Sequence, residues 1–100
     1  MPPEGRGVAD GRQRLDRWLF FSRATKSRTL ARKLIEAGLV RVNSARVVAP
    51  DRLVGPGDVL TMTLNHRLRV WRIRDAGRRR GPATEAASLY EDLTPDLPLD

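Results

Sequence analysis

The stretch from Thr25 to Asn43 constrains the fold most, because its pattern predicts one amphipathic helix that runs directly into a strand. Ser27 is a favourable N-cap, since its side-chain oxygen can accept a hydrogen bond from a free N–H of the first turn. Gly38 stands where a left-handed residue ends a helix. At 100° per residue, apolar and polar side chains fall on opposite arcs. We therefore expect a helix that packs with one face and presents charge with the other.

The apolar arc should contain Leu30, Ala31, Leu34, Ile35 and Ala37, and the polar arc Arg28, Thr29, Arg32, Lys33 and Glu36. A single helix of this kind is most often a solvated surface, so the charge of the whole chain matters. The net charge is +7, but residues 12–80 carry 18 basic and five acidic residues, whereas residues 83–100 carry five acids and no base. This asymmetry indicates a polyanionic partner. Arginine predominates among the bases, which favours bidentate contacts with phosphate.

The composition excludes several classes of site. A chain of 100 residues makes one small domain, and it has no cysteine and one histidine, His66, so thiolate and multi-histidine metal sites are excluded. No apolar run has the roughly 18 residues of a membrane span, and the N-terminus has no apolar signal-peptide core. The acids are dispersed among arginines and form no paired-carboxylate site. We expect a cytoplasmic protein that is not an enzyme, uses no cofactor and touches no membrane.

A first helix is expected over 13–23, before a connection of four residues. Trp18 belongs to its inner stripe, and Phe20 and Phe21 are expected to pack in the core, with stacking on nucleic-acid bases as the alternative. Two helices joined so tightly also resemble a helix-turn-helix, so a DNA-binding module stays open.

The remaining chain predicts short strands and a final helix. Strands are expected at 40–42, at 47–48 after an Asn43-Ser44 turn, and in a hairpin that pairs 59–64 with 68–74. Residues 50–58 should form a loop that ends in a tight Pro56-Gly57-Asp58 turn. Residues 83–93 should form a helix. Apolar positions change phase between Val70 and Trp71, which predicts a bulge or an exposed Trp71. The expected divisions are a disordered lead over 1–12, a domain over 13–75, a basic loop and helix over 76–93, and a flexible acidic tail over 94–100.

These motifs, taken in order, resemble the alpha-L RNA-binding domain. The resemblance covers Arg14 to Met62 and consists of R-L-D-R-W-L, S-R-T-L-A-R-K-L-I-E-A-G-L-V-R-V-N and V-G-P-G-D-V-L. That domain is known from a small-subunit ribosomal protein, some pseudouridine synthases and tyrosyl-tRNA synthetases. The segment R-R-R-G-P-A-T-E-A-A-S-L-Y-E-D is similar to the tail of the small ribosome-associated heat-shock proteins of bacteria. The expected fold is α+β, with two helices packed on a small, mostly antiparallel sheet and a C-terminal helix.

The resemblance implies non-catalytic binding of structured RNA, with the large ribosomal subunit as partner in a stress or ribosome-rescue role. By position, the RNA-binding residues would be Lys26, Arg28, Arg32, Lys33, Arg41, Asn43 and Arg46, with Arg14 and Arg17 as helpers. We also expect a monomer. One departure is Ser44, since the family usually has Asn-Gly at this turn and serine is disfavoured at positive φ. The alternatives are a DNA-binding module, a module that binds an acidic protein, and an RNA-binding accessory to a separate enzyme.

Overall fold

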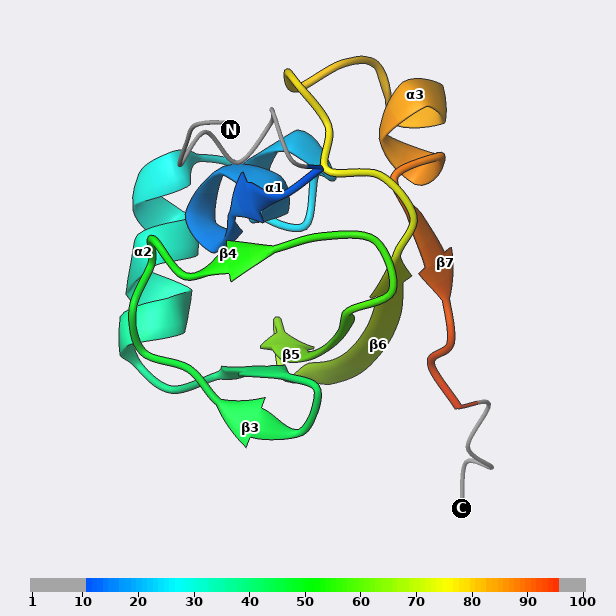
Figure 1. Cartoon of the computed structure of the whole chain (residues 1–100). Helices are drawn as coiled ribbons and strands as arrows, with labels where there is room; N and C mark the ends of the chain where they lie inside the picture. The colour runs from blue at the N-terminus through cyan, green and yellow to red at the C-terminus, as the bar shows by residue number, and fades with distance from the viewer. Residues whose placement is uncertain (1–10, 96–100) are drawn as a thin grey trace, which may run out of the picture.

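The computed structural model describes residues 11–95, so most of the expected disordered lead and acidic tail lies outside the described residues. The elements are β1 (Gln13–Arg14), α1 (Leu15–Phe21), α2 (Arg28–Glu36), β2 (Val40–Val42), β3 (Ala45–Arg46), β4 (Leu53–Val54), β5 (Val59–Leu64), β6 (Arg67–Ile73), α3 (Ala83–Ala87) and β7 (Tyr90–Asp92). Five strands form an antiparallel sheet in the order β3-β2-β5-β6-β7, and β1 pairs with β4. The helices α1 and α2 lie together at one side, with α3 and β7 at the other (Figure 1). The α+β prediction is confirmed.

Helix α2 begins and ends where the sequence predicts. The Ser27 side chain accepts a hydrogen bond from the Leu30 N–H at 3.0 Å, and Gly38 follows the helix with a φ of +78°. The apolar arc is narrower than expected. Ala31 and Ile35 are fully buried, whereas Leu30 is 47% exposed. Leu34 is half-buried and Ala37 exposed, so part of the apolar face is left uncovered.

Helix α1 is shorter than predicted because the first two residues of the expected helix form a strand that pairs with a distant strand. Gln13 and Arg14 extend as β1 and pair with β4, which lies within the segment expected to be a loop. The chain just before β4 supplies carbonyl groups to the first turn of α1. The Leu15 N–H donates to the Arg52 carbonyl at 2.8 Å, and the Asp16 N–H to the Pro50 carbonyl at 3.0 Å. These bonds satisfy two N–H groups that lack helical partners, so α1 needs no side-chain cap.

Strand β2 and its turn are as predicted, but the strand after the turn is Ala45–Arg46 and not Val47-Val48. The Val47 N–H still donates to the Val40 carbonyl at 3.2 Å, after which the chain leaves the sheet toward β4. Asn43 and Ser44 have φ values of +51° and +74°, the pattern that a type I′ turn requires. The turn therefore keeps this conformation despite the serine.

Replacing Ser44 with glycine should raise the free energy of unfolding by about 1 kcal/mol, because glycine adopts positive φ without a Cβ penalty. Urea denaturation measures the change. His66, at φ +65° in the β5–β6 turn, occupies the same kind of position, so His66→Gly should give a similar gain. A Ser44→Gly variant no more stable than the parent would show that the turn is not strained.

The β5–β6 hairpin is regular, and the prediction of a bulge or an exposed Trp71 is wrong. The register runs without interruption from Val59 opposite Arg72 to Leu64 opposite Arg67. Trp71 is 7% exposed, lies opposite the fully buried Leu60, and stacks on Tyr90 with ring centroids 3.7 Å apart. The apparent change of phase arises because the side of β6 that faces the core carries arginines near the hairpin turn and apolar residues beyond it.

The C-terminal segment forms a short helix followed by a strand, and not the predicted helix over 83–93. Helix α3 ends at Ala87, and β7 pairs with β6 with Tyr90 opposite Ile73. Pairing with β6 and stacking on Trp71 outweigh the local helical pattern. Thr94, expected to be loose, accepts a hydrogen bond from the Val70 N–H at 2.9 Å. The division of the chain at residue 75 stays a prediction, although β7 joins the main sheet.

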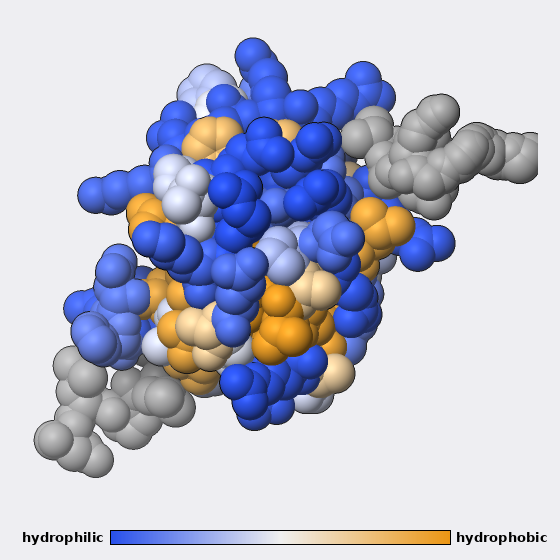
Figure 2. Space-filling model, turned by 90° about the vertical axis from the view of Figure 1, so that its left-hand side faces the viewer, coloured by the Kyte–Doolittle hydropathy of each residue, from blue (hydrophilic) through white to orange (hydrophobic). Residues whose placement is uncertain are grey.

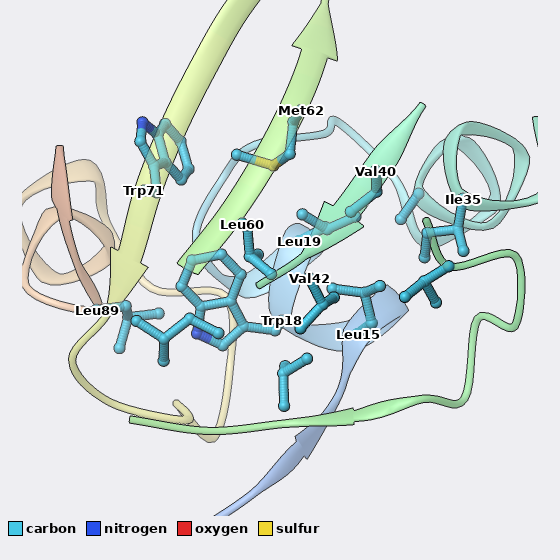
Figure 3. Packing of buried hydrophobic residues seen from close by; sticks show 14 residues of the cluster. Leu15, Trp18, Leu19, Ile35, Val40, Val42, Leu60, Met62, Trp71 and Leu89 are labelled. Carbon is cyan, nitrogen blue, oxygen red and sulfur yellow. The ribbon is translucent and has the colours of Figure 1, made fainter. Parts of the chain in front are cut away.

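The core lies between the helix pair and the sheet, around Trp18 (Figure 3). Trp18 is fully buried, and its indole N–H donates to the Asp75 carbonyl at 2.9 Å. Its ring meets Trp71 and Tyr90 edge-on, at centroid distances of 6.3 and 6.4 Å. The core prediction for Trp18 is confirmed. Phe21 packs against the core while half-buried.

Candidate nucleic-acid interface

The start of α2 gathers positive charge at a place where a helix prefers negative charge. The Thr25 hydroxyl donates to the Ser27 carbonyl at 3.0 Å, and Ser27 caps the helix, so Lys26 and Arg28 flank the cap. The first turn of α2 contains no acidic residue. Free N–H groups and the helix dipole make this end positive already, so the two cations oppose helix formation and favour a bound anion.

The cations of α2 lie on two flanks and not on a single line. Lys26 and Lys33 border a groove of about 510 Å³ whose floor is mainly apolar and includes Leu30, Leu34 and Leu39. Arg28 and Arg32 do not line this groove. Arg32 is turned 100° around the helix axis from Lys33, so its side chain leaves the helix in a different direction. Figure 2 shows this side of the molecule, where hydrophilic surface predominates and an apolar area lies in the lower half. The helix therefore presents cations on both sides of its exposed ridge.

The Arg46 side chain of the β2–β3 pair lies beside the end of α2. A Cβ added to Gly38 would collide with the guanidinium of Arg46, which therefore lies against the backbone just after the helix. A cation is stabilised there by the negative end of the helix dipole. Gly38 thus serves two purposes, since it adopts positive φ and leaves space for Arg46.

Arg41 and Arg46 lie directly opposite each other in the β2–β3 ladder, and both are exposed. Like charges in this position destabilise a strand pair, and bound anions would reduce the repulsion. The Arg41 guanidinium donates to the Ser44 carbonyl at 3.3 Å, which holds it over the turn. The pair is thus the second cluster of cations beside α2.

Asn43 is held by contacts within the protein. Its side-chain N–H donates to the Asp58 carboxylate at 2.9 Å, and its side-chain oxygen accepts from the Val59 N–H at 2.9 Å. The other Asp58 oxygen accepts from the Gly55 N–H at 2.9 Å, within the predicted Pro56-Gly57-Asp58 turn. The amide of Asn43 therefore fixes the β2–β3 turn against the next turn of the chain.

Arg14 and Arg17 differ in how available their side chains are to a ligand. Arg14 forms a two-pronged contact with the fully buried carboxylate of Asp16, at 3.0 and 2.9 Å. The hydrogen bond with Asp16 raises the pKa of Arg14, so this arginine stays charged but is partly neutralised. Arg17 is exposed. The structure therefore leaves Arg17 more available than Arg14 as a helper.

The basic run at 78–80 is largely structural. Arg80 donates to the Phe20 carbonyl at 3.2 Å and lies over the Phe20 ring at 4.8 Å, and Arg79 pairs with Glu85 at 2.7 Å. These contacts fasten the loop after β6 to α1 and α3. Arg80 thus occupies a face of Phe20 that the base-stacking alternative would need.

Sequence reasoning missed a third group of arginines, Arg23, Arg67 and Arg69, which line one cavity. The one sign of them in the sequence was that the alternation of apolar and polar residues changes phase just before Trp71. Within residues 11–95 no cluster of three or more His, Cys, Asp or Glu could hold a metal ion. The same residues include no helix with the length and apolar character needed to cross a membrane.

Comparison with known proteins matches residues 13–60 to the S4 domain family. Heat shock protein 15 of Escherichia coli K12 is 39% identical over 79 residues, which cover 79% of this chain and 59% of that protein. This chain therefore spans less than two thirds of that relative. The RQC P-site tRNA stabilizing factor of Bacillus subtilis is 34% identical, over 80% of this chain and 91% of that one.

A trimeric structure of heat shock protein 15 from Vibrio cholerae superimposes with a TM-score of 0.77 at 34% identity, covering 81% of each chain. Its trimeric state gives no support to the monomer expected from the sequence. The ordered motifs, the α+β architecture and these relatives agree with one another. The chain belongs to the S4 domain family, the alpha-L RNA-binding fold, and is homologous to heat shock protein 15.

Proposed function

We propose that this protein binds structured RNA without catalysis, through α2 and the β2–β3 turn. The observation that supports this most is the placement of cations around α2. Lys26 and Arg28 flank its positive end, Lys33 borders a groove, and Arg41 faces Arg46 beside its other end. Such an arrangement neutralises successive phosphates of a folded nucleic acid. Asn43 supports it by holding the turn.

The partner that we propose is ribosomal RNA of the large subunit, in a cytoplasmic role in stress or ribosome rescue. The name heat shock protein 15 supports the stress role, and the name RQC P-site tRNA stabilizing factor supports the role in ribosome rescue. Sedimentation of a cell lysate through a gradient tests it. The protein should travel with large subunits, and its recovery only at the top of the gradient would contradict the proposed partner.

Duplex DNA is the second candidate, because α1 and α2 are joined by a short connection like that of a helix-turn-helix. The structure disfavours it, since α2 leads at once into β2 and Arg46 lies against the end of the helix. Competition between an RNA hairpin and duplex DNA of equal length at matched salt separates the two. Preference for the hairpin is expected, and preference for the duplex would overturn RNA as the ligand.

A further inference from the structure

A cavity of about 530 Å³ opens at the end of the sheet that the helix pair leaves uncovered. Helix α1 ends at Phe21, and the chain turns away at Arg23, which has a φ of +66°. The β5–β6 hairpin extends further, so α1 does not cover the core side of its last residues, which borders the cavity together with α3. Arg69 lies opposite the buried Met62, and Arg67 opposite Leu64, so both arginines are on that side. Two cations thus stand where a sheet normally carries apolar residues.

The walls of this cavity combine positive charge with an apolar surface. Arg23, Arg67 and Arg69 line it together with Asn65, and α3 contributes alanines. No carboxylate is among the described residues that line it. Asp92 faces Trp71 across the β6–β7 pair, but it lies outside the lining and accepts from the Thr94 N–H at 2.9 Å. The cavity is therefore suited to an anionic group attached to a flat apolar one.

One residue that lines this cavity also carries an unused hydrogen-bond donor. The indole N–H of Trp71 is buried and has no hydrogen-bond partner among residues 11–95, although Trp71 is one of the lining residues. In Figure 3 its nitrogen lies on the side of the ring away from Trp18 and Leu60. A buried N–H without an acceptor is unfavourable, and an oxygen of a ligand could satisfy it after a small shift of the surrounding side chains.

The cavity adjoins the groove beside α2. Ala24, Leu64 and Asn65 line both, so the two hollows meet at the hairpin turn. Lys26 and Lys33 border the groove on its other part. One polyanion could therefore run from α2 across the groove and into the cavity, which favours a nucleic-acid strand over a separate small anion.

We propose that this cavity holds an unpaired nucleotide of the bound RNA, with its phosphate among Arg23, Arg67 and Arg69. The apolar part of the nucleotide lies against α3, and a phosphate oxygen accepts from the indole N–H of Trp71. This inference rests on RNA as the ligand. It adds that a single-stranded extension beside the folded region is recognised, which the cations of α2 do not require.

The test compares a blunt RNA hairpin with the same hairpin carrying a short oligouridine extension at either end, using the full chain at fixed salt. An extension at one of the two ends should tighten binding about tenfold, as expected for new charge-assisted hydrogen bonds. The paired variant Arg67→Gln/Arg69→Gln should abolish this gain. The control Arg72→Gln/Arg74→Gln removes the same formal charge from exposed positions at the end of β6 and just after it, and it should keep the gain from the extension.

Nitrogen-15 NMR of the two indole groups gives an independent reading. The Trp71 indole signal, assigned with a Trp71→Phe variant, should shift with the extended hairpin and not with the blunt one, while the Trp18 signal stays in place. Equal affinity for blunt and extended hairpins, a gain that survives in Arg67→Gln/Arg69→Gln, or an unmoved Trp71 signal would overturn the inference. Binding of the blunt hairpin tests RNA as the ligand by itself, so the two failures are distinguishable.

Discussion

Replacing Trp18 with alanine should lower the free energy of unfolding by about 3–5 kcal/mol. The side chain is fully buried and meets the rings of Trp71 and Tyr90 edge-on. Its removal leaves a cavity between the helix pair and the sheet, and it deprives the Asp75 carbonyl of its donor. Denaturant unfolding measures the loss, with circular dichroism to show whether the variant still folds.

Trp71→Phe is the matched control, because it also reduces a buried indole but breaks no hydrogen bond found in residues 11–95. We expect a cost below about 1.5 kcal/mol, since the phenyl ring can still stack on Tyr90 and an unpaired N–H is removed. Equal losses for Trp18→Ala and Trp71→Phe would show that Trp18 does not organise the core.

Neutralising the four cations at α2 should weaken RNA binding about a hundredfold at moderate salt. The variant carries Lys26→Gln, Arg28→Gln, Arg32→Gln and Lys33→Gln. If the parent neutralises roughly six phosphates, its log K should fall against log salt with a slope of about −4 to −5. In the variant, the slope of log K against log salt should be less negative by about 3. Its folding should be unimpaired, because Lys26 and Arg28 oppose the helix dipole.

The control is a variant with the same change in net charge at other exposed or loop positions, Arg72→Gln, Arg74→Gln, Arg78→Gln and Arg79→Gln. Its slope of log K against log salt should stay close to that of the parent protein. A flat salt response in the parent, or equal losses in the two variants, would mean that α2 does not carry the phosphate contacts.

The parts of the fold that were predicted correctly depend on local chemistry. The N-cap at Ser27 and the stop at Gly38 are each fixed by residues within a few positions, and so is the turn at Asn43. The regular alternation over 59–64 likewise matches β5 residue for residue. Signals of this kind can be read without knowing where the rest of the chain lies.

The missed elements depend on distant partners. Gln13 and Arg14 are extended only because β4 lies beside them, and Tyr90 joins a strand because it stacks on Trp71. In the candidate site, the sequence placed Arg28, Arg32 and Lys33 on one polar arc of the helix, although only Lys33 of these three borders the groove. The contact of Arg46 with the backbone at Gly38 had no sequence signal, since it depends on how the β2–β3 pair returns to the helix.

The proposed RNA-binding surface consists of α2 and the β2–β3 turn. Backbone amide NMR during titration with an RNA hairpin tests it most directly, because every non-proline residue reports its own environment. We expect the largest shifts within residues 26–46, from Lys26 just before α2 to the end of β3. Shifts concentrated in α1 or in residues 76–93, with α2 unchanged, would contradict it.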